Sequence, residues 1–224
     1  MKSFNWLLVL SVLSCIGCSS PVHEDGRGCA FVSDSIQYRV EFMSAGCVRI
    51  LSFPEGDTLV TKRLVVDSEK PAFKDYKWED TGQKLLFRTR ELSVVFDKAD
   101  AAFIFQETST GKLLLKEKGD RKARNFKRSV AGGEQCLEVT QRFVPTEDEA
   151  IYGLGQYQNG IMNYRGKSVL LLQANMDIVN PFLISTNGYG VLWDNYSSTK
   201  FEDTKEGYSF TSEVGDASDY YFVY

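Results

Sequence analysis

The sequence lacks most of the groups on which catalytic sites depend. It holds a single histidine, His23, in a polar stretch near the N-terminus, so a Ser-His-Asp or Cys-His arrangement cannot form in the body of the chain. A zinc site with histidine ligands is excluded there for the same reason. Gly153-Leu154-Gly155 opens like a dinucleotide-binding fingerprint, but Gln158 stands where the third glycine belongs. We therefore expect no metal and no cofactor.

An excess of positive charge is also missing. The formal net charge is −4, whereas proteins that bind nucleic acid carry a basic stripe. The one basic cluster, within residues 121–128, is expected to be a solvated loop. No amphipathic helical stretch longer than two turns occurs. The sequence therefore argues against a nucleic-acid partner and against a helical fold.

The first 18 residues have the pattern of a secretory signal. Lys2 precedes a short apolar run, residues 6–13, which is too short to span a membrane. Val12-Leu13-Ser14-Cys15 fits the end of a bacterial lipoprotein signal, with Cys15 as the lipidated residue. Cys18 is a second candidate, and an ordinary cleaved signal is the alternative. We expect an exported, membrane-anchored lipoprotein, in the periplasm or on the outer-membrane surface.

The polar, turn-rich residues 19–30 are expected to form a tether, and residues 31–224 a single domain. The remaining cysteines are Cys29, Cys47 and Cys136. In an exported protein two of these could pair, or all three could be buried free thiols. The sequence leaves both arrangements open.

The body of the chain has the pattern of an all-β protein. Apolar residues alternate with polar ones over residues 36–42 and again over residues 208–213, which predicts half-buried strands. Turn signals separate further strand-like runs, among them Pro54–Asp57, Thr110-Gly111 and Asn187-Gly188. Residues 58–66 are expected to form another strand. Many short strands with regular turns predict an antiparallel β-sandwich. The final run, residues 219–224, ends without a turn or cap, so we expect the domain to be truncated there.

The composition changes between residues 149 and 197, where glycine, amide and aromatic side chains become dense. Amides offer both donors and acceptors to sugar hydroxyls, and aromatic faces cover the apolar surface of a sugar. Within this region the sequence resembles glycoside hydrolase family 31. The resemblance is carried, in order, by Tyr152–Gln156, Asn163–Gly166, Asn175-Met176-Asp177, Pro181-Phe182 and Gly188–Leu192. The exact residues of these motifs are most similar to those of the α-xylosidases of Bacteroidetes.

The resemblance implies a galactose-mutarotase-like sandwich that precedes a catalytic TIM barrel. In the family the barrel carries an aspartate nucleophile and an aspartate general acid. A TIM barrel needs about 250 residues, so neither it nor its aspartates are in this chain. The family's substrate loop corresponds to residues 173–177, which implies Asp177 as a hydroxyl acceptor, with Asn175 shaping the loop and Gln173 as a further substrate-binding residue. The alternative for Asp177 is a plain turn residue.

The roles of five other residues follow less directly. Tyr152 and Gly153 are expected to be structural, and Trp193 to lie in the core or at a domain interface. Gln156 and Arg165 stay undecided between the rim of the sugar site and the framework. The leading hypothesis is the N-terminal module of an α-xylosidase that acts on xyloglucan oligosaccharides and is inactive without its barrel. The alternative is a stand-alone surface lipoprotein that binds carbohydrate without cleaving it.

Overall fold

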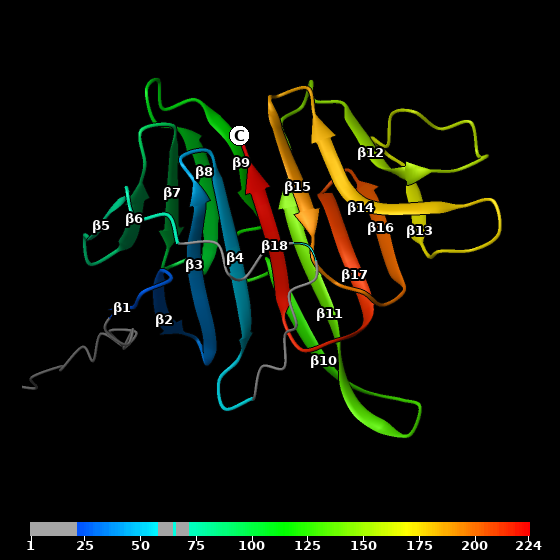
Figure 1. Ribbon diagram of the computed structural model, residues 1–224, viewed down its shortest axis with the longest axis horizontal. Helices are drawn as coiled ribbons and strands as arrows, with labels where there is room; N and C mark the ends of the chain where they lie inside the picture. The colour runs from blue at the N-terminus through cyan, green and yellow to red at the C-terminus, as the bar shows by residue number, and fades with distance from the viewer. Residues whose placement is uncertain (1–21, 58–64, 66–71) are drawn as a thin grey trace, which may run out of the picture.

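The computed structural model describes residues 22–57, 65 and 72–224. Two antiparallel sheets pack face to face, as the all-β prediction requires, and no helix occurs among these residues (Figure 1). The expected strand over residues 58–66 lies outside the described residues, except for Val65. The signal segment with Cys15 and Cys18 also lies outside them. In the described residues, no helix is long and apolar enough to cross a membrane.

The first sheet has eight strands. In order across the sheet they are β1 (His23–Glu24), β2 (Cys29–Ser33), β3 (Ile36–Ser44), β4 (Cys47–Pro54), β18 (Ser218–Val223), β15 (Tyr189–Trp193), β14 (Ile178–Ser185) and β12 (Ile151–Gln156). β18 therefore pairs with β4 on one side and with β15 on the other. A buried ion pair accompanies the β4–β18 ladder, in which Arg49 Nε donates to Asp219 Oδ1 at 2.7 Å.

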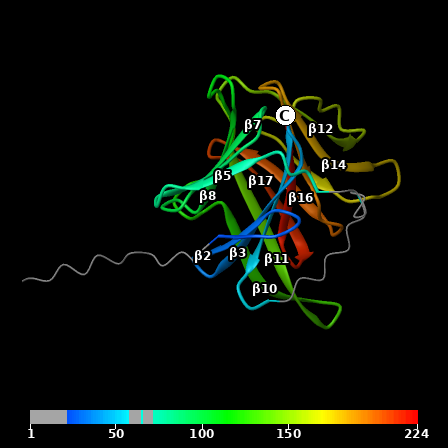
Figure 2. The same cartoon turned by 60° about the vertical axis from the view of Figure 1, so that its left-hand side comes forward.

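The second sheet has ten strands. Nine form one path: β13 (Ser168–Leu171), β16 (Thr199–Thr204), β17 (Gly207–Gly215), β11 (Glu134–Val144), β9 (Leu113–Glu117), β8 (Ala102–Glu107), β7 (Leu92–Asp97), β6 (Lys84–Arg88) and β5 (Lys77–Asp80). The tenth, β10 (Arg124–Ala131), pairs with β11, and this hairpin projects from the sandwich (Figure 2). The basic cluster of the sequence is thus divided between a turn and a strand.

The alternating pattern buries one face of β17, whereas β7 and β18 are buried on both faces. In β17, Tyr208, Phe210 and Ser212 are buried, and the residues between them are partly exposed, as their period of two predicts. The three predicted turns join β4 to the next segment, β8 to β9, and β14 to β15. Aromatic side chains fill the space between the sheets in a continuous set that includes Phe31, Tyr38, Phe96, Phe103, Phe105, Phe222, Phe143, Tyr208 and Phe210.

A group of polar side chains is buried among these rings. Glu117 accepts hydrogen bonds from the backbone N–H of Phe103 at 2.7 Å, from Gln141 Nε2 at 2.9 Å and from the Tyr220 hydroxyl at 2.9 Å. It also forms an ion pair with Arg124. Burial opposes the charge of Arg124, but attraction to Glu117 outweighs it and holds the pKa of the guanidinium above its usual value. We call these five residues the Glu117 cluster.

The prediction that residues 19–30 form a tether is wrong for its second half. β1 and the start of β2 lie within it, and Cys29 is fully buried. The carboxylate of Glu24 accepts hydrogen bonds from the Tyr76 hydroxyl at 2.9 Å and from Trp78 Nε1 at 3.1 Å. Partners some 50 residues away therefore fix a stretch whose own composition is that of a linker.

The thiols of Cys29, Cys47 and Cys136 are all free. Cys29 is buried, whereas the other two are half-buried, so the expectation of three buried thiols holds fully for Cys29 alone. Burial raises the pKa of Cys29 and of Cys47 to about 11, which keeps both thiols protonated at neutral pH.

Candidate functional site

The segment 173–177 forms a projecting loop that joins β13 of one sheet to β14 of the other (Figure 1). The loop closes on itself, because the backbone N–H of Asp177 donates to the Ala174 carbonyl at 3.3 Å. Asn175 and Met176 make the turn, and Met176 takes a left-handed φ of 71° with its side chain 66% exposed. The loop is thus a short, closed hairpin at the edge of the sandwich.

The three residues predicted to meet the substrate differ in what they contact. Both ends of the Gln173 amide hydrogen-bond to the backbone. Nε2 donates to the Asp177 carbonyl at 2.9 Å, and Oε1 accepts from the Val179 N–H at 3.1 Å. By contrast, no hydrogen bond within the described residues engages the Asn175 amide or the Asp177 carboxylate. Asp177 is half-buried and Asn175 is exposed. Both can therefore serve hydroxyl groups of a ligand.

The Tyr152–Gln156 motif supports this loop by pairing with the strand that follows it. Its strand, β12, pairs with β14 through a bulge between Gly153 and Gly155, which have φ angles of 98° and 119°. A Cβ added at Gly153 would lie 2.4 Å from the Phe182 carbonyl oxygen, and one at Gly155 would lie 2.1 Å from that of Ile178. Only glycine permits so close an approach. The motif is therefore structural, and it presses β12 against the strand that leaves the loop.

Tyr157 is a member of the site that the sequence did not single out. Its hydroxyl donates to the Leu154 carbonyl at 2.9 Å, across the bulge. Burial raises the pKa of Tyr157 to about 12, and the neighbouring Tyr164 and Asp177 add to the shift. The Tyr157 hydroxyl thus stays protonated near the Asp177 carboxylate. A tyrosine directly after a glycine-rich motif was the available signal for this role.

Arg165 belongs to the framework, which settles one undecided residue. Its Nε donates to Asp203 Oδ2 at 3.0 Å, and its Nη1 donates to the carbonyls of Thr146 at 3.1 Å and Glu149 at 3.3 Å. The carboxylate of Glu149 is buried and accepts the Thr146 N–H at 2.8 Å, so it is also satisfied internally. These groups fix the segment that leads into β12.

Trp193 lies in the core. It is fully buried, stacks on Phe210 with ring centroids 5.6 Å apart, and donates from Nε1 to Ser212 Oγ at 2.9 Å. It offers no face to a sugar. Gln156, the other undecided residue, is exposed and lies opposite Ile178 in the β12–β14 ladder, beside the loop.

Large apolar side chains are exposed around the loop. Tyr152 and Ile184 are direct cross-strand neighbours on β12 and β14, and both are exposed, as is Ile178 at the start of β14. Four more exposed apolar side chains stand on β13 and on the connections from β12 to β13 and from β13 to β14. The set then comprises Tyr152, Met162, Leu170, Leu172, Met176, Ile178 and Ile184. We call this set the apolar end. A cluster of exposed apolar side chains is typical of interaction surfaces.

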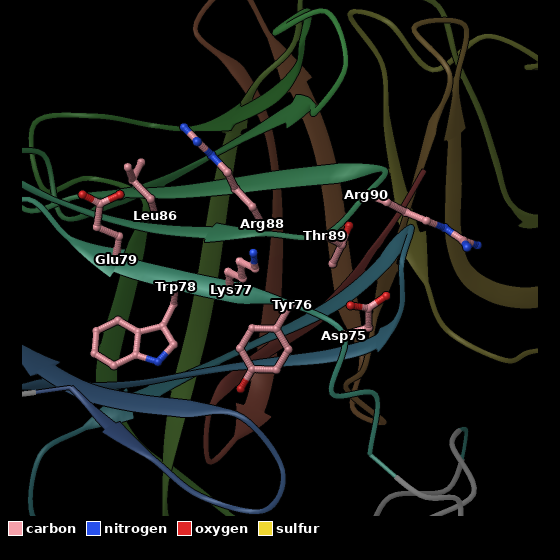
Figure 3. Close-up of a pocket in the computed structure, with 9 residues that line it drawn as sticks. All are labelled: Asp75, Tyr76, Lys77, Trp78, Glu79, Leu86, Arg88, Thr89 and Arg90. Atoms are coloured by element: carbon pink, nitrogen blue, oxygen red, sulfur yellow. The ribbon is translucent and has the colours of Figure 1, made fainter.

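A separate groove of about 570 Å³ lies on β5 and β6 and is shown in Figure 3. The rings of Tyr76 and Trp78 point to one side of β5, and Glu79, Leu86 and Arg88 point to the other (Figure 3). The polar atoms of both rings bind Glu24. The Tyr76 ring also stacks on Phe42 with centroids 5.1 Å apart, so both side chains serve the packing of the N-terminal strands. Residues 22–57, 65 and 72–224 also contain no group of three or more side chains that could hold a metal ion.

Comparisons with known proteins agree with this arrangement. The chain is 32% identical over 205 residues to an alpha-xylosidase of Saccharolobus solfataricus, an alignment that covers 85% of this chain and 26% of that enzyme. It superimposes on a soil-metagenome GH31 alpha-xylosidase complexed with xylose with a TM-score of 0.76, at 23% identity, covering 91% of this chain and 32% of that one. A Flavobacterium johnsoniae GH31 dextranase complexed with isomaltotriose gives a TM-score of 0.72 at 21% identity, with 93% and 26% covered.

The chain thus spans about a quarter of the length of the Saccharolobus relative and about a third or less of the two solved structures. Residues 37–202 match the model of the glycosyl hydrolase 31 N-terminal galactose mutarotase-like domain. This match covers most of the chain and includes the glycine motif and the loop. The chain belongs to glycoside hydrolase family 31, of which it is the N-terminal galactose-mutarotase-like domain.

Proposed function

We propose that this chain is the N-terminal part of a retaining exo-α-glycosidase and lends one loop to the sugar pocket. The observation that carries the proposal is the loop 173–177, whose backbone is closed while no described residue hydrogen-bonds to the side chains of Asp177 and Asn175. An ionised carboxylate accepts strong hydrogen bonds from hydroxyl groups. Asp177 is the acceptor in this proposal, and Asn175 adds an amide beside it.

The proposed substrate is an α-xyloside of xyloglucan oligosaccharides. The relative with 32% identity and the solved structure with bound xylose are both named alpha-xylosidases. The dextranase shares the fold, and a family 31 glucosidase of Pseudescherichia vulneris is 36% identical over 45% of this chain. The choice of xylose therefore rests on the longer alignment to the Saccharolobus enzyme, which covers 85% of this chain. The kinship with Bacteroidetes enzymes stays a prediction.

The second part of the proposal concerns the apolar end, which would support a catalytic barrel on the same polypeptide. Tyr152, Ile178 and Ile184 share the outer face of β12 and β14, next to the loop. A barrel that covers this face would bring its own groups toward Asp177. The domain alone would then be inactive, because the catalytic aspartates of the family belong to the barrel.

The first test is the mass of the native product in the membrane fraction, detected with an antibody to residues 31–224. A barrel adds about 250 residues, so we expect a product of at least roughly twice the mass of this chain. In that product, Asp177→Asn should lower kcat/KM for an aryl α-xyloside by about tenfold or more, because a hydrogen bond to a charged acceptor is lost. Asp75→Asn, on the far side of the sandwich, is the matched control.

Two results would contradict the proposal. One is turnover of an aryl α-xyloside by these 224 residues alone. The other is a native product near 25 kDa that binds xyloglucan oligosaccharides, which would favour the stand-alone carbohydrate-binding lipoprotein.

We also infer export and attachment to the membrane through a lipid on Cys15. The pattern Val12-Leu13-Ser14-Cys15 supports this inference. Metabolic labelling with palmitate should mark the wild-type chain and the Cys18→Ser variant but not Cys15→Ser. Loss of label in Cys18→Ser alone would move the anchor to Cys18.

A further inference from the structure

We propose that Gln173 is a positioning residue that fixes the loop 173–177 in its presenting shape before any sugar arrives. Its amide joins the limb of the loop that leaves β13 to the limb that enters β14, through the Asp177 carbonyl at 2.9 Å and the Val179 N–H at 3.1 Å. We call these two hydrogen bonds of Gln173 the clamp. The inference rests on the proposed function, because the clamp matters for function only if the loop binds a sugar. It also moves Gln173 from the substrate-contacting role that the resemblance implied.

The chemistry of the amide explains why glutamine suits this position. The Asp177 carbonyl needs a donor and the Val179 N–H needs an acceptor, and a single side-chain amide supplies both. Glutamate would supply the acceptor alone, and methionine would keep the length of the side chain without either bond.

The limb that enters β14 is held from β12 as well. Gly155 approaches the backbone of this limb so closely that an added Cβ would lie 2.1 Å from the Ile178 carbonyl oxygen and 2.9 Å from the Asn180 nitrogen. Val179 lies opposite Gly155 in the ladder, between these two contacts. The backbone on both sides of Val179 is thus fixed by β12, and its N–H is fixed by Gln173.

The consequence is a preformed site. With the Gln173 amide engaged, the polar groups left for a ligand are those of Asp177 and Asn175. A loop that is already ordered loses less conformational entropy on binding, so each contact contributes more to affinity. Positioning of this kind also keeps the carboxylate aligned during the reaction.

The test compares three variants of the full chain by amide hydrogen exchange. Gln173→Met should speed exchange at Val179 by about tenfold, the factor expected for the loss of one ordinary hydrogen bond. Gln173→Glu should leave Val179 close to the wild-type rate, because its carboxylate still accepts that N–H. Gln158→Met, at an exposed glutamine of the neighbouring loop, should change nothing.

A general loss of stability would not give this pattern, so the thermal unfolding midpoint is measured alongside. The clamp predicts equal midpoints for all variants and a rate change confined to the loop and Val179. Unchanged exchange at Val179 in Gln173→Met would overturn the clamp. Faster exchange in Gln173→Glu to the same extent as in Gln173→Met would also overturn it, since the acceptor is retained there.

Xylose, titrated into the same proteins, links the clamp to function. We expect the amide signals of residues 175–177 to shift with xylose, and Gln173→Met to weaken the apparent affinity by about fivefold or more. Faster exchange with unaltered xylose affinity would reduce Gln173 to a structural residue and overturn the positioning role. If xylose shifts no amide signal of the wild-type chain, while exchange at Val179 speeds up in Gln173→Met, the result would count against the proposed sugar contact and leave the clamp supported.

Discussion

The Glu117 cluster and the loop 173–177 use similar polar side chains in opposite ways. In the cluster, the carboxylate of Glu117 is 98% hidden from solvent and binds three neutral donors and one guanidinium. In the loop, the carboxylate of Asp177 is half-exposed, and no hydrogen bond from a described residue reaches it. One carboxylate has all its partners within the fold, and the other is left to meet a partner from outside.

The difference teaches where stability and function are located in this domain. A buried charge without partners is strongly destabilising, so the cluster must be complete for the sandwich to fold. The loop tolerates open polar groups because water can hydrogen-bond to them. The backbone of the loop, in contrast, is tightly held by Gly155 and Gln173. Four substitutions probe this division, from the largest expected effect to the smallest.

Glu117→Leu should destabilise the fold most strongly. It leaves Arg124 buried without its carboxylate, and such a change costs about 3–5 kcal/mol in the free energy of unfolding. Urea denaturation measures the loss. Glu138→Leu on the neighbouring strand β11 removes a partly exposed contact of 3.7 Å with Lys127 and should lower stability by no more than about 1 kcal/mol. Similar losses in the two variants would mean that the cluster has no special role.

Gly155→Ala should strain the support of the loop. Its φ of 119° and the closeness of the Ile178 carbonyl predict a loss of about 1–3 kcal/mol. The amide signals of residues 175–178 should move as β14 is displaced. Gly160→Ala, with a φ of 68° and open space around it, should cost about 1–2 kcal/mol and leave those signals in place. If the amide signals of residues 175–178 do not move in Gly155→Ala, the close approach of Gly155 does not hold the loop in place.

Replacing both Tyr152 and Ile184 with serine should change association more than stability. The free energy of unfolding should fall by no more than about 1 kcal/mol, the range of one cross-strand pair. Self-association of the isolated domain, followed by light scattering over a range of concentrations, should decrease. Val130→Ser on the projecting hairpin removes a more exposed apolar side chain away from the apolar end and should leave association unchanged. If Val130→Ser lowered self-association more than the double variant, the associating surface would lie on the hairpin.

Asp177→Asn should have the smallest effect on the fold. No hydrogen bond from the described residues depends on its carboxylate, so the unfolding free energy should stay within about 0.5 kcal/mol of wild type. A larger loss, measured by the same urea titration, would show that Asp177 serves the framework and would end the contrast with Glu117.

The sequence predicted the parts of this fold that local patterns encode. A period of two in Tyr208, Phe210 and Ser212 is enough to predict a strand with one buried face. Turn residues such as Asn187-Gly188 predict which strands are joined. The glycine motif and the Asn175–Asp177 segment identified the family and its loop, because they recur in a fixed order.

Long-range partners could not be predicted in the same way. Glu24 lies in a stretch with the composition of a linker, and its binding to Tyr76 and Trp78 depends on how the two sheets meet. Gln173 raised a similar difficulty. A glutamine beside a sugar loop can face the ligand or the backbone, and the residue type serves both equally well. Distances decided between the two.

The position of β18 has a consequence for how the protein is made. Within the eight-stranded sheet, β18 lies between β4 and β15, and Arg49 gains its ion pair with Asp219 from 170 residues further along the chain. On the ribosome, the early hairpins must therefore persist with an unpaired edge until Val223 has left the exit tunnel. Contacts of such long sequence separation form slowly, and unpaired edges invite aggregation meanwhile. Expression at low temperature or with a chaperone should accordingly raise the soluble yield.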